Sequence, residues 1–234
     1  MRKKIRFLYI ILLFIPGINA GTEIYFSADS EIYSRYIFRG LSPAGPQASA
    51  SLSAFAYFPD HNIGVVQSYL NSLADISAYH ESLSMLSYYH YFNERLTGSA
   101  GVLAYLFPCA ENTPPLTMEL HLRFSDTGAA IPYSVETYFD IVVKSWHWRF
   151  SAAHTFDTVL PIQIRVSSGI NAFSYQQFEK NIPSGFSDVS ATLSTYISLN
   201  NWQFTPKISY IVSLNKTMRN PMLLQARFNT AYSF

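Results

Sequence analysis

The spacing best suited to catalysis is in the segment His80-Glu81-Ser82. On a β-strand, residues i and i+2 share a face, so His80 is placed to activate Ser82 as a nucleophile toward an ester. The sequence identifies no acid or amide that would orient His80. We therefore favour a chance pairing in a segment that contains several Ser and His residues, and keep lipid hydrolysis as an alternative.

The other residues that could form a metal site, an acid–base pair, a phosphate site or a disulfide framework lack the spacing that such sites require. His147 and His154 are seven positions apart and His121 stands alone, which is not metal-ligand spacing. There is no paired-carboxylate signature and no glycine-rich phosphate loop. The single cysteine, Cys109, excludes an internal disulfide framework. We predict no catalytic residue, no metal site and no cofactor.

A set of charged residues recurs in phase with the apolar alternation of the predicted strands, and we predict that these residues line a pore. They are Arg35, Arg39, Glu119, Arg123, Glu136, Asp140, Arg149, Arg165, Lys207 and Arg227. The bases other than Arg123 fall on strands that are neighbours in a closed barrel. The acids, with Glu81, fall on the strands opposite. Two interpretations stay open: a transverse field between a basic and an acidic wall, or ion pairs that brace the lumen. Asp29 and Glu31, near Arg35, favour bracing, as does Arg123 among the acids.

The strands that would carry these residues are recognisable by their period of two. Residues 116–124 place Leu116, Met118, Leu120, Leu122 and Phe124 on one face, opposite Thr117, Glu119, His121 and Arg123. We predict an all-β fold, a transmembrane antiparallel up-and-down barrel of about 12 strands. The predicted strands are 23–39, 47–57, 63–71, 75–92, 96–106, 116–124, 131–141, 144–154, 160–174, 187–199, 202–213 and 224–234. Pro206 removes a ladder donor and predicts a bulge or bend.

The two ends of the chain predict export and membrane assembly. Four basic residues, an apolar run over 7–15 and Ala20 before Gly21 predict a signal peptide over 1–20, with the barrel over 21–234. The last strand ends on Phe234, which is typical of the C-terminal signal read by the barrel assembly machinery. We expect the mature chain in the outer membrane of a Gram-negative bacterium, in contact with its lipid.

Composition narrows the class of protein. Removing residues 1–20 leaves 12 basic residues against 15 acidic ones, a balance of −3 that argues against nucleic acid as a partner. Charged residues make up 13% of the chain and aromatic residues 16%. No second apolar run reaches the length of a membrane-spanning helix. Apolar side chains are instead spread over alternating strands, as in a membrane barrel.

The apolar rows must face lipid, because an Arg or Lys on the lipid face costs about 2–4 kcal/mol at the bilayer midplane. A lipocalin-like barrel would invert this arrangement, but twelve strands enclose too much space for an apolar filling. On residues 63–71, this reasoning puts Val66 and Leu70 outside and Gln67 and Asn71 inside. We expect interfacial girdles from aromatic residues near strand ends. They are Tyr57, Phe58, Tyr105, Phe107, Phe124, Phe173, Tyr175, Trp202 and Phe234.

The segment 33–42 resembles the opening motif of the TorF-type porin family of proteobacteria. The matching residues are Tyr36, Phe38, Arg39, Gly40 and Ser42, followed by a Pro/Gly-rich loop and a strand of small residues. The resemblance covers this region and the C-terminus, and it implies a pore-like protein without naming a solute. We expect a channel for passive diffusion of small hydrophilic solutes. The alternatives are a non-conducting structural barrel and the lipid hydrolase that uses His80 and Ser82.

Overall fold

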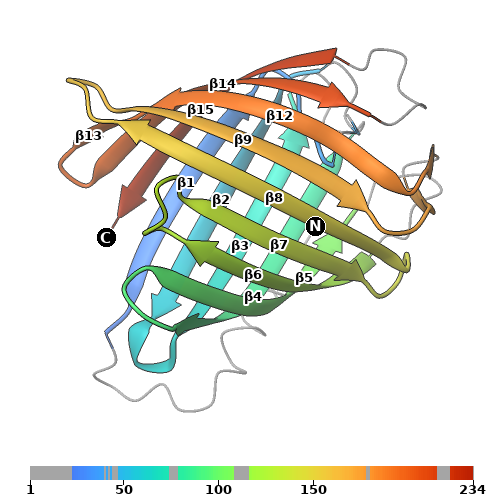
Figure 1. Cartoon of the computed structure of the whole chain (residues 1–234), viewed down its shortest axis with the longest axis horizontal. Helices are drawn as coiled ribbons and strands as arrows, with labels where there is room; N and C mark the ends of the chain where they lie inside the picture. The colour runs from blue at the N-terminus through green and yellow to red at the C-terminus, as the bar shows by residue number, and fades with distance from the viewer. Residues whose placement is uncertain are drawn as a thin grey trace, which may run out of the picture.

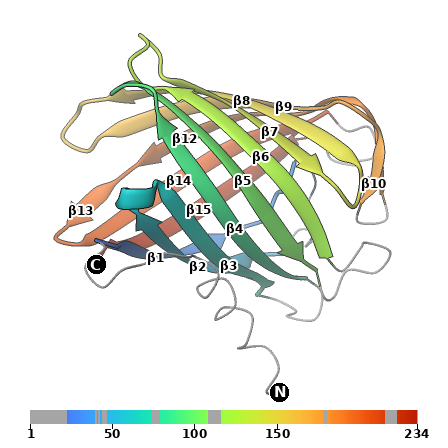
Figure 2. The same ribbon diagram turned by 90° about the horizontal axis from the view of Figure 1, so that it is seen from below.

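The computed structural model describes residues 23–39, 41, 43, 47–73, 79–107, 116–177, 180–214 and 222–233. Figures 1 and 2 show tilted strands rolled into a barrel. Its wall consists of twelve long antiparallel strands. They are β1 (Tyr25–Tyr33), β2 (Ser49–Phe58), β3 (Ile63–Ser72), β4 (His80–Tyr91), β5 (Leu96–Leu106), β6 (Leu116–Asp126), β7 (Tyr133–Asp140), β8 (Ser145–Phe156), β9 (Ile162–Asn171), β12 (Gly185–Thr195), β14 (Trp202–Ser213) and β15 (Met222–Ser233).

The sheet closes on itself. Consecutive long strands pair along the wall, β12 pairs with β14, and β1 pairs with β15 through Ile32 opposite Phe228. The predicted barrel of about twelve strands is therefore confirmed. Three short strands and one 3-10 turn complete the described elements. They are β10 (Tyr175–Gln177), β11 (Lys180–Ile182), β13 (Ile197–Leu199) and η1 (Pro59–His61).

Alternation along β6 determines its two faces as predicted. Leu120 and Leu122 are 47% and 56% exposed on the outer face. Glu119 precedes Leu120, and His121 lies between the two leucines. Both are buried on the lumen side. No described helix has the length and apolarity to cross a membrane. The lipid-facing surface of this strand is thus a row of aliphatic side chains.

The first strand is shorter than predicted. It ends at Tyr33, so Arg35 and Arg39 lie beyond it rather than on the wall. The chain turns into the barrel because Tyr36 and Phe38 find partners there. The Tyr36 ring lies 5.9 Å from that of Tyr79, and the Phe38 ring 5.9 Å from that of Tyr105. We call the described residues 34–39 and 41 the inner segment.

An apolar filling closes part of the lumen at the end where the longer loops lie, which we call the loop end. One cluster contains Leu70, Tyr79, Leu103, Tyr105 and Phe107. A second joins Leu41 of the inner segment to Tyr175 and Ile182 of the β10–β11 hairpin. Tyr105, Phe107 and Tyr175 therefore do not stand in a lipid-facing girdle as predicted. These three side chains are instead buried inside the barrel, where they close part of the lumen.

On β3 the predicted faces are reversed. Leu70 is 4% exposed and packs in the first cluster, inside the barrel. Asn71, its neighbour along the strand, therefore faces outward, and Gln67 shares its side. The rule that apolar rows face lipid fails here because the lumen under β3 is filled by aromatic side chains rather than water.

Pro206 interrupts the strand pairing on one edge of β14 rather than producing a bulge. Its pairing with Phe228 on β15 keeps an unbroken register. On the other edge, the β12–β14 ladder ends at Lys207 and pairing resumes only at Phe204, opposite β13. The predicted strand 187–199 is split at this gap. The register shift in this part of the wall lies instead between Phe186 and Asp188, opposite β9.

Candidate functional site

The lumen contains a polar cavity of about 530 Å³ on the side formed by β7–β9, β12, β14 and β15. A second cavity, of about 490 Å³, lies at the opposite end from the loops and includes the β6–β7 turn in its lining. Both are lined by Ser151, Gln163 and Arg165, so they meet along the inner wall. Hydroxyl pairs such as Ser167–Ser190, at 2.7 Å, cover much of the surface between the charges. Such a surface is suited to water and hydrophilic solutes.

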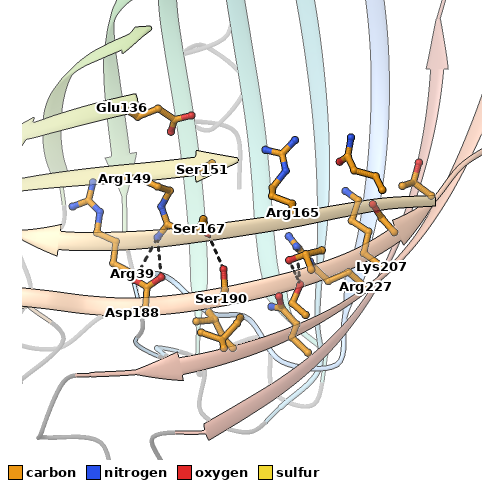
Figure 3. A pocket seen from close by; sticks show the side chains of 18 of the residues that line it. Arg39, Glu136, Arg149, Ser151, Arg165, Ser167, Asp188, Ser190, Lys207 and Arg227 are labelled. Carbon is orange, nitrogen blue, oxygen red and sulfur yellow. Dashed lines mark hydrogen bonds and ion pairs between the residues drawn. The ribbon is translucent and has the colours of Figure 1, made fainter. Parts of the chain in front are cut away.

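Basic side chains dominate the first cavity. Figure 3 shows Arg149, Arg165, Lys207 and Arg227 around the same space, from β8, β9, β14 and β15. With Arg39, five bases line the cavity against two acids, Glu136 and Asp188. Bases therefore outnumber acids among the residues that line this cavity.

Three of these bases are held by carboxylates that lie one or two strands away in the sheet. Arg149 lies 3.5 Å from Asp188, and Lys207 and Arg227 lie 3.3 and 4.0 Å from Glu31. A Cβ at Gly169 would lie 2.8 Å from Asp188 Oδ2, so glycine on β9 makes room for the first pair. Asp188 was not among the predicted site residues. It sits beside the bulge, where the alternation of the sequence is broken.

Arg165 differs from the other bases of the cavity. Within the described residues it has no hydrogen bond and no ion pair, while its side chain lines both cavities. A guanidinium has five donors and stays charged at all relevant pH values. Arg165 is therefore the lining base whose charge is least compensated.

Arg39 lies in a different environment. Its guanidinium donates to Glu119 at 2.7 Å, with side-chain exposures of 6% and 1%. It also lies over the rings of Phe38 and Tyr138, at 4.8 and 5.2 Å. Burial is the largest single influence on the pKa of Arg39 and lowers it, but Glu119 together with Tyr175 and Tyr105 raises the pKa above its ordinary value. Arg39 therefore fastens the inner segment to β6.

The acids predicted to form the opposite wall are mostly engaged locally. Glu81 accepts hydrogen bonds from Tyr79 at 2.6 Å and Tyr36 at 3.3 Å. Burial raises the pKa of Tyr36 well above its ordinary value, as does Glu81, so its phenol remains a donor. Asp140 accepts from the backbone N–H groups of Val142 and Val143, both at 2.8 Å, and caps the turn after β7.

The remaining predicted residues divide between the cavities and the wall. Glu136 lines the first cavity and pairs with Arg123 at 3.6 Å, while Arg123 lines the second. Arg35, Glu119 and Asp140 are not among the lining residues of either cavity. The acids are therefore engaged in ion pairs and local hydrogen bonds, while the lining of the first cavity contains more bases than acids.

Two histidines that lack metal-ligand spacing face the lumen. His121 stacks on Tyr138 with ring centroids 4.6 Å apart, and His147 Nδ1 lies 2.9 Å from Asn171 Oδ1. His121 Nδ1, His121 Nε2 and His147 Nε2 are buried without a partner among the described residues. Their alternation in phase with Glu119 and Arg149 would have placed them in the lumen. The described residues include no cluster of three or more potential metal ligands.

Comparison with known proteins shows the fold. No family model and no curated protein sequence matches the chain. Among solved structures, it is similar to "KdgM porin", with a TM-score of 0.59, 11% identity, and coverage of 90% of this chain and 99% of that one. A structure titled "NanC porin structure in rhombohedral crystal form" gives 0.58, 7%, 89% and 100%. "LpxR from Salmonella typhimurium" gives 0.54, 9%, 89% and 100%. At these identities the shared property is the barrel, and the TorF-type resemblance remains a prediction.

Proposed function

We propose that the chain is an outer-membrane channel for passive diffusion of small hydrophilic solutes, and that its lining favours anionic ones. The observation that carries this proposal is the excess of bases in the 530 Å³ cavity, with Arg165 uncompensated. A positive wall in a low-dielectric barrel raises the local concentration of anions.

The similar structures support this proposal by analogy. One is titled "KdgM porin in complex with disordered oligogalacturonate", and that ligand is a chain of acidic sugars. A row of hydroxyl and amide side chains beside the bases would serve the hydroxyl groups of such solutes. Export through residues 1–20 and assembly through Phe234 belong to the same proposal, and both lie outside the described residues.

The test is single-channel current from the refolded mature protein in planar bilayers. We expect discrete steps and a reversal potential in a salt gradient that shows anion preference. Arg165→Glu should shift the permeability ratio several-fold toward cations, because it reverses the least compensated charge in the lumen. Arg95→Glu makes the same charge change in the exposed β4–β5 turn and should leave selectivity almost unchanged.

Two outcomes would contradict the proposal. Silence from protein shown to be folded by heat-modifiable electrophoretic mobility would mean a closed structural barrel, filled from the loop end by the inner segment. Currents whose selectivity responds equally to Arg165→Glu and Arg95→Glu would mean that the basic wall does not set the field.

A further inference from the structure

The outer face of β3 and β4 carries two hydrogen-bonded groups of polar side chains. Gln67 Nε2 donates to Ser82 Oγ at 3.1 Å, and Ser84 Oγ donates to Gln67 Oε1 at 2.6 Å. His80 and Asn71 are joined through Nδ1 and Oδ1. On these two strands the odd positions of β3 and the even positions of β4 face lipid. Polar groups at such positions are costly, and a functional role is the default hypothesis for them.

Asn71 supplies the orienting group that the sequence could not identify for His80. The two residues are direct partners across β3 and β4, so the contact between their side chains follows from the register. When Asn71 Oδ1 accepts from Nδ1–H, the imidazole is fixed in the tautomer whose Nε2 is unprotonated. That tautomer is the one a general base needs.

Ser82 follows His80 on the same face, about 6.8 Å further along the strand. Its hydroxyl is hydrogen-bonded to Gln67 Nε2, which also donates to the carbonyl of Leu83 at 3.0 Å. Within the described residues no hydrogen bond joins His80 to Ser82, so the reaction requires the imidazole and the hydroxyl to approach each other. The Gln67 amide stands beside the nucleophile, where an oxyanion donor is required.

The depth of the group in the membrane matches that of lipid esters. His80 is the first residue of β4, and Asn71 is the penultimate residue of β3, so both lie near the loop end of the wall. Strand ends lie where the hydrocarbon gives way to the interface that holds the ester bonds. Beside the group, Tyr69 and Leu52 are 42% and 61% exposed and offer apolar surface to an acyl chain.

We propose that Ser82, His80, Asn71 and Gln67 form an esterase site that cleaves an acyl ester of a membrane lipid, on the opposite side of the wall from the pore. Ser82 Oγ attacks the ester carbonyl and His80 Nε2 takes the hydroxyl proton. His80 then gives that proton to the departing alkoxide, which leaves as the lyso-lipid. Water, deprotonated by His80, attacks the acyl-serine and releases the fatty acid, and the proton returns to Ser82.

The first experiment treats refolded protein in phospholipid micelles with a fluorophosphonate probe and locates the label by peptide mass spectrometry. We expect the label on Ser82, together with release of fatty acid from the phospholipid. Ser82→Ala should abolish both, and His80→Ala should lower hydrolysis by about 10²- to 10⁴-fold. Ser30→Ala and His90→Ala replace the same residue types elsewhere in the wall and should retain the activity.

Asn71 is tested as a positioning residue. Asn71→Leu should lower kcat with little change in KM, whereas Asn71→Asp keeps an acceptor oxygen and should restore activity with a shifted pH profile. Absence of both label and hydrolysis in folded wild-type protein would overturn the proposal, as would hydrolysis that survives Ser82→Ala. Channel currents recorded from the same preparations test the proposed channel separately from the proposed esterase. Ser82→Ala leaves the lumen lining intact, so it should not change those currents.

Discussion

Replacing Glu119 with alanine is expected to lower the free energy of unfolding by about 3–5 kcal/mol. The change leaves the Arg39 guanidinium buried with its charge uncompensated, since Glu119 is its 2.7 Å partner and both side chains are almost fully enclosed. The inner segment should then lose its attachment to β6. The measurement is urea-induced unfolding in detergent or lipid vesicles, followed by tryptophan fluorescence and by the shift in electrophoretic mobility.

A matched control is Glu136→Ala, which breaks the more exposed pair with Arg123. Because Arg123 is 46% exposed, loss of that pair should cost only about 0–1 kcal/mol. Glu136→Ala also removes the acceptor of the Tyr138 hydroxyl, which adds about 1 kcal/mol. The exchange Arg39→Glu with Glu119→Arg should recover part of the stability lost in either single variant. Equal losses for Glu119→Ala and Glu136→Ala would show that the Arg39–Glu119 pair does not fasten the inner segment.

Leu120→Arg is expected to destabilise the barrel by about 2–4 kcal/mol in a lipid bilayer. Leu120 lies near the middle of β6 and is 47% exposed on the outer face, so the new guanidinium would lie in hydrocarbon. The measurement is the free energy of folding into vesicles by urea titration.

Ser151→Arg is the companion variant for Leu120→Arg. Ser151 lines both cavities, so an arginine there enters a hydrated lumen and should cost far less stability. Because it adds positive charge, it should also increase anion preference in planar bilayers. A smaller loss for Leu120→Arg than for Ser151→Arg would mean that the two faces of the wall are assigned the wrong way round.

The class of fold and most of the wall could be predicted from local patterns. Along β6 and β8 the alternation is regular because one face meets lipid and the other meets the polar interior of the barrel. The polarity of each residue therefore indicates the face on which it lies. Arg149 and Arg165 were placed in the lumen by this argument, and both line the cavity. The same argument identified His80 and Ser82 as residues of one face without indicating which face.

The argument fails where the lumen is not aqueous. Aromatic side chains fill the space inside β3, so Leu70 on the inner side and Asn71 on the outer side look reversed to a rule based on polarity. The pattern predicts the inner segment as the end of a strand because Arg35 and Arg39 fall on the positions opposite to those of Tyr36 and Phe38. Nothing local indicates that their partners are Tyr79 and Tyr105, which are distant in the sequence.

The sequence alone determined that this chain forms an antiparallel barrel of about twelve strands with a charged lining, because a period of two is a local property of each strand. Only the tertiary structure decided which charges are compensated. Arg39 contacts Glu119 because the inner segment turns into the barrel. Asn71 contacts His80 because the register of β3 on β4 places them opposite each other. These contacts depend on register and on the filling of the lumen, which are set by packing around the whole barrel.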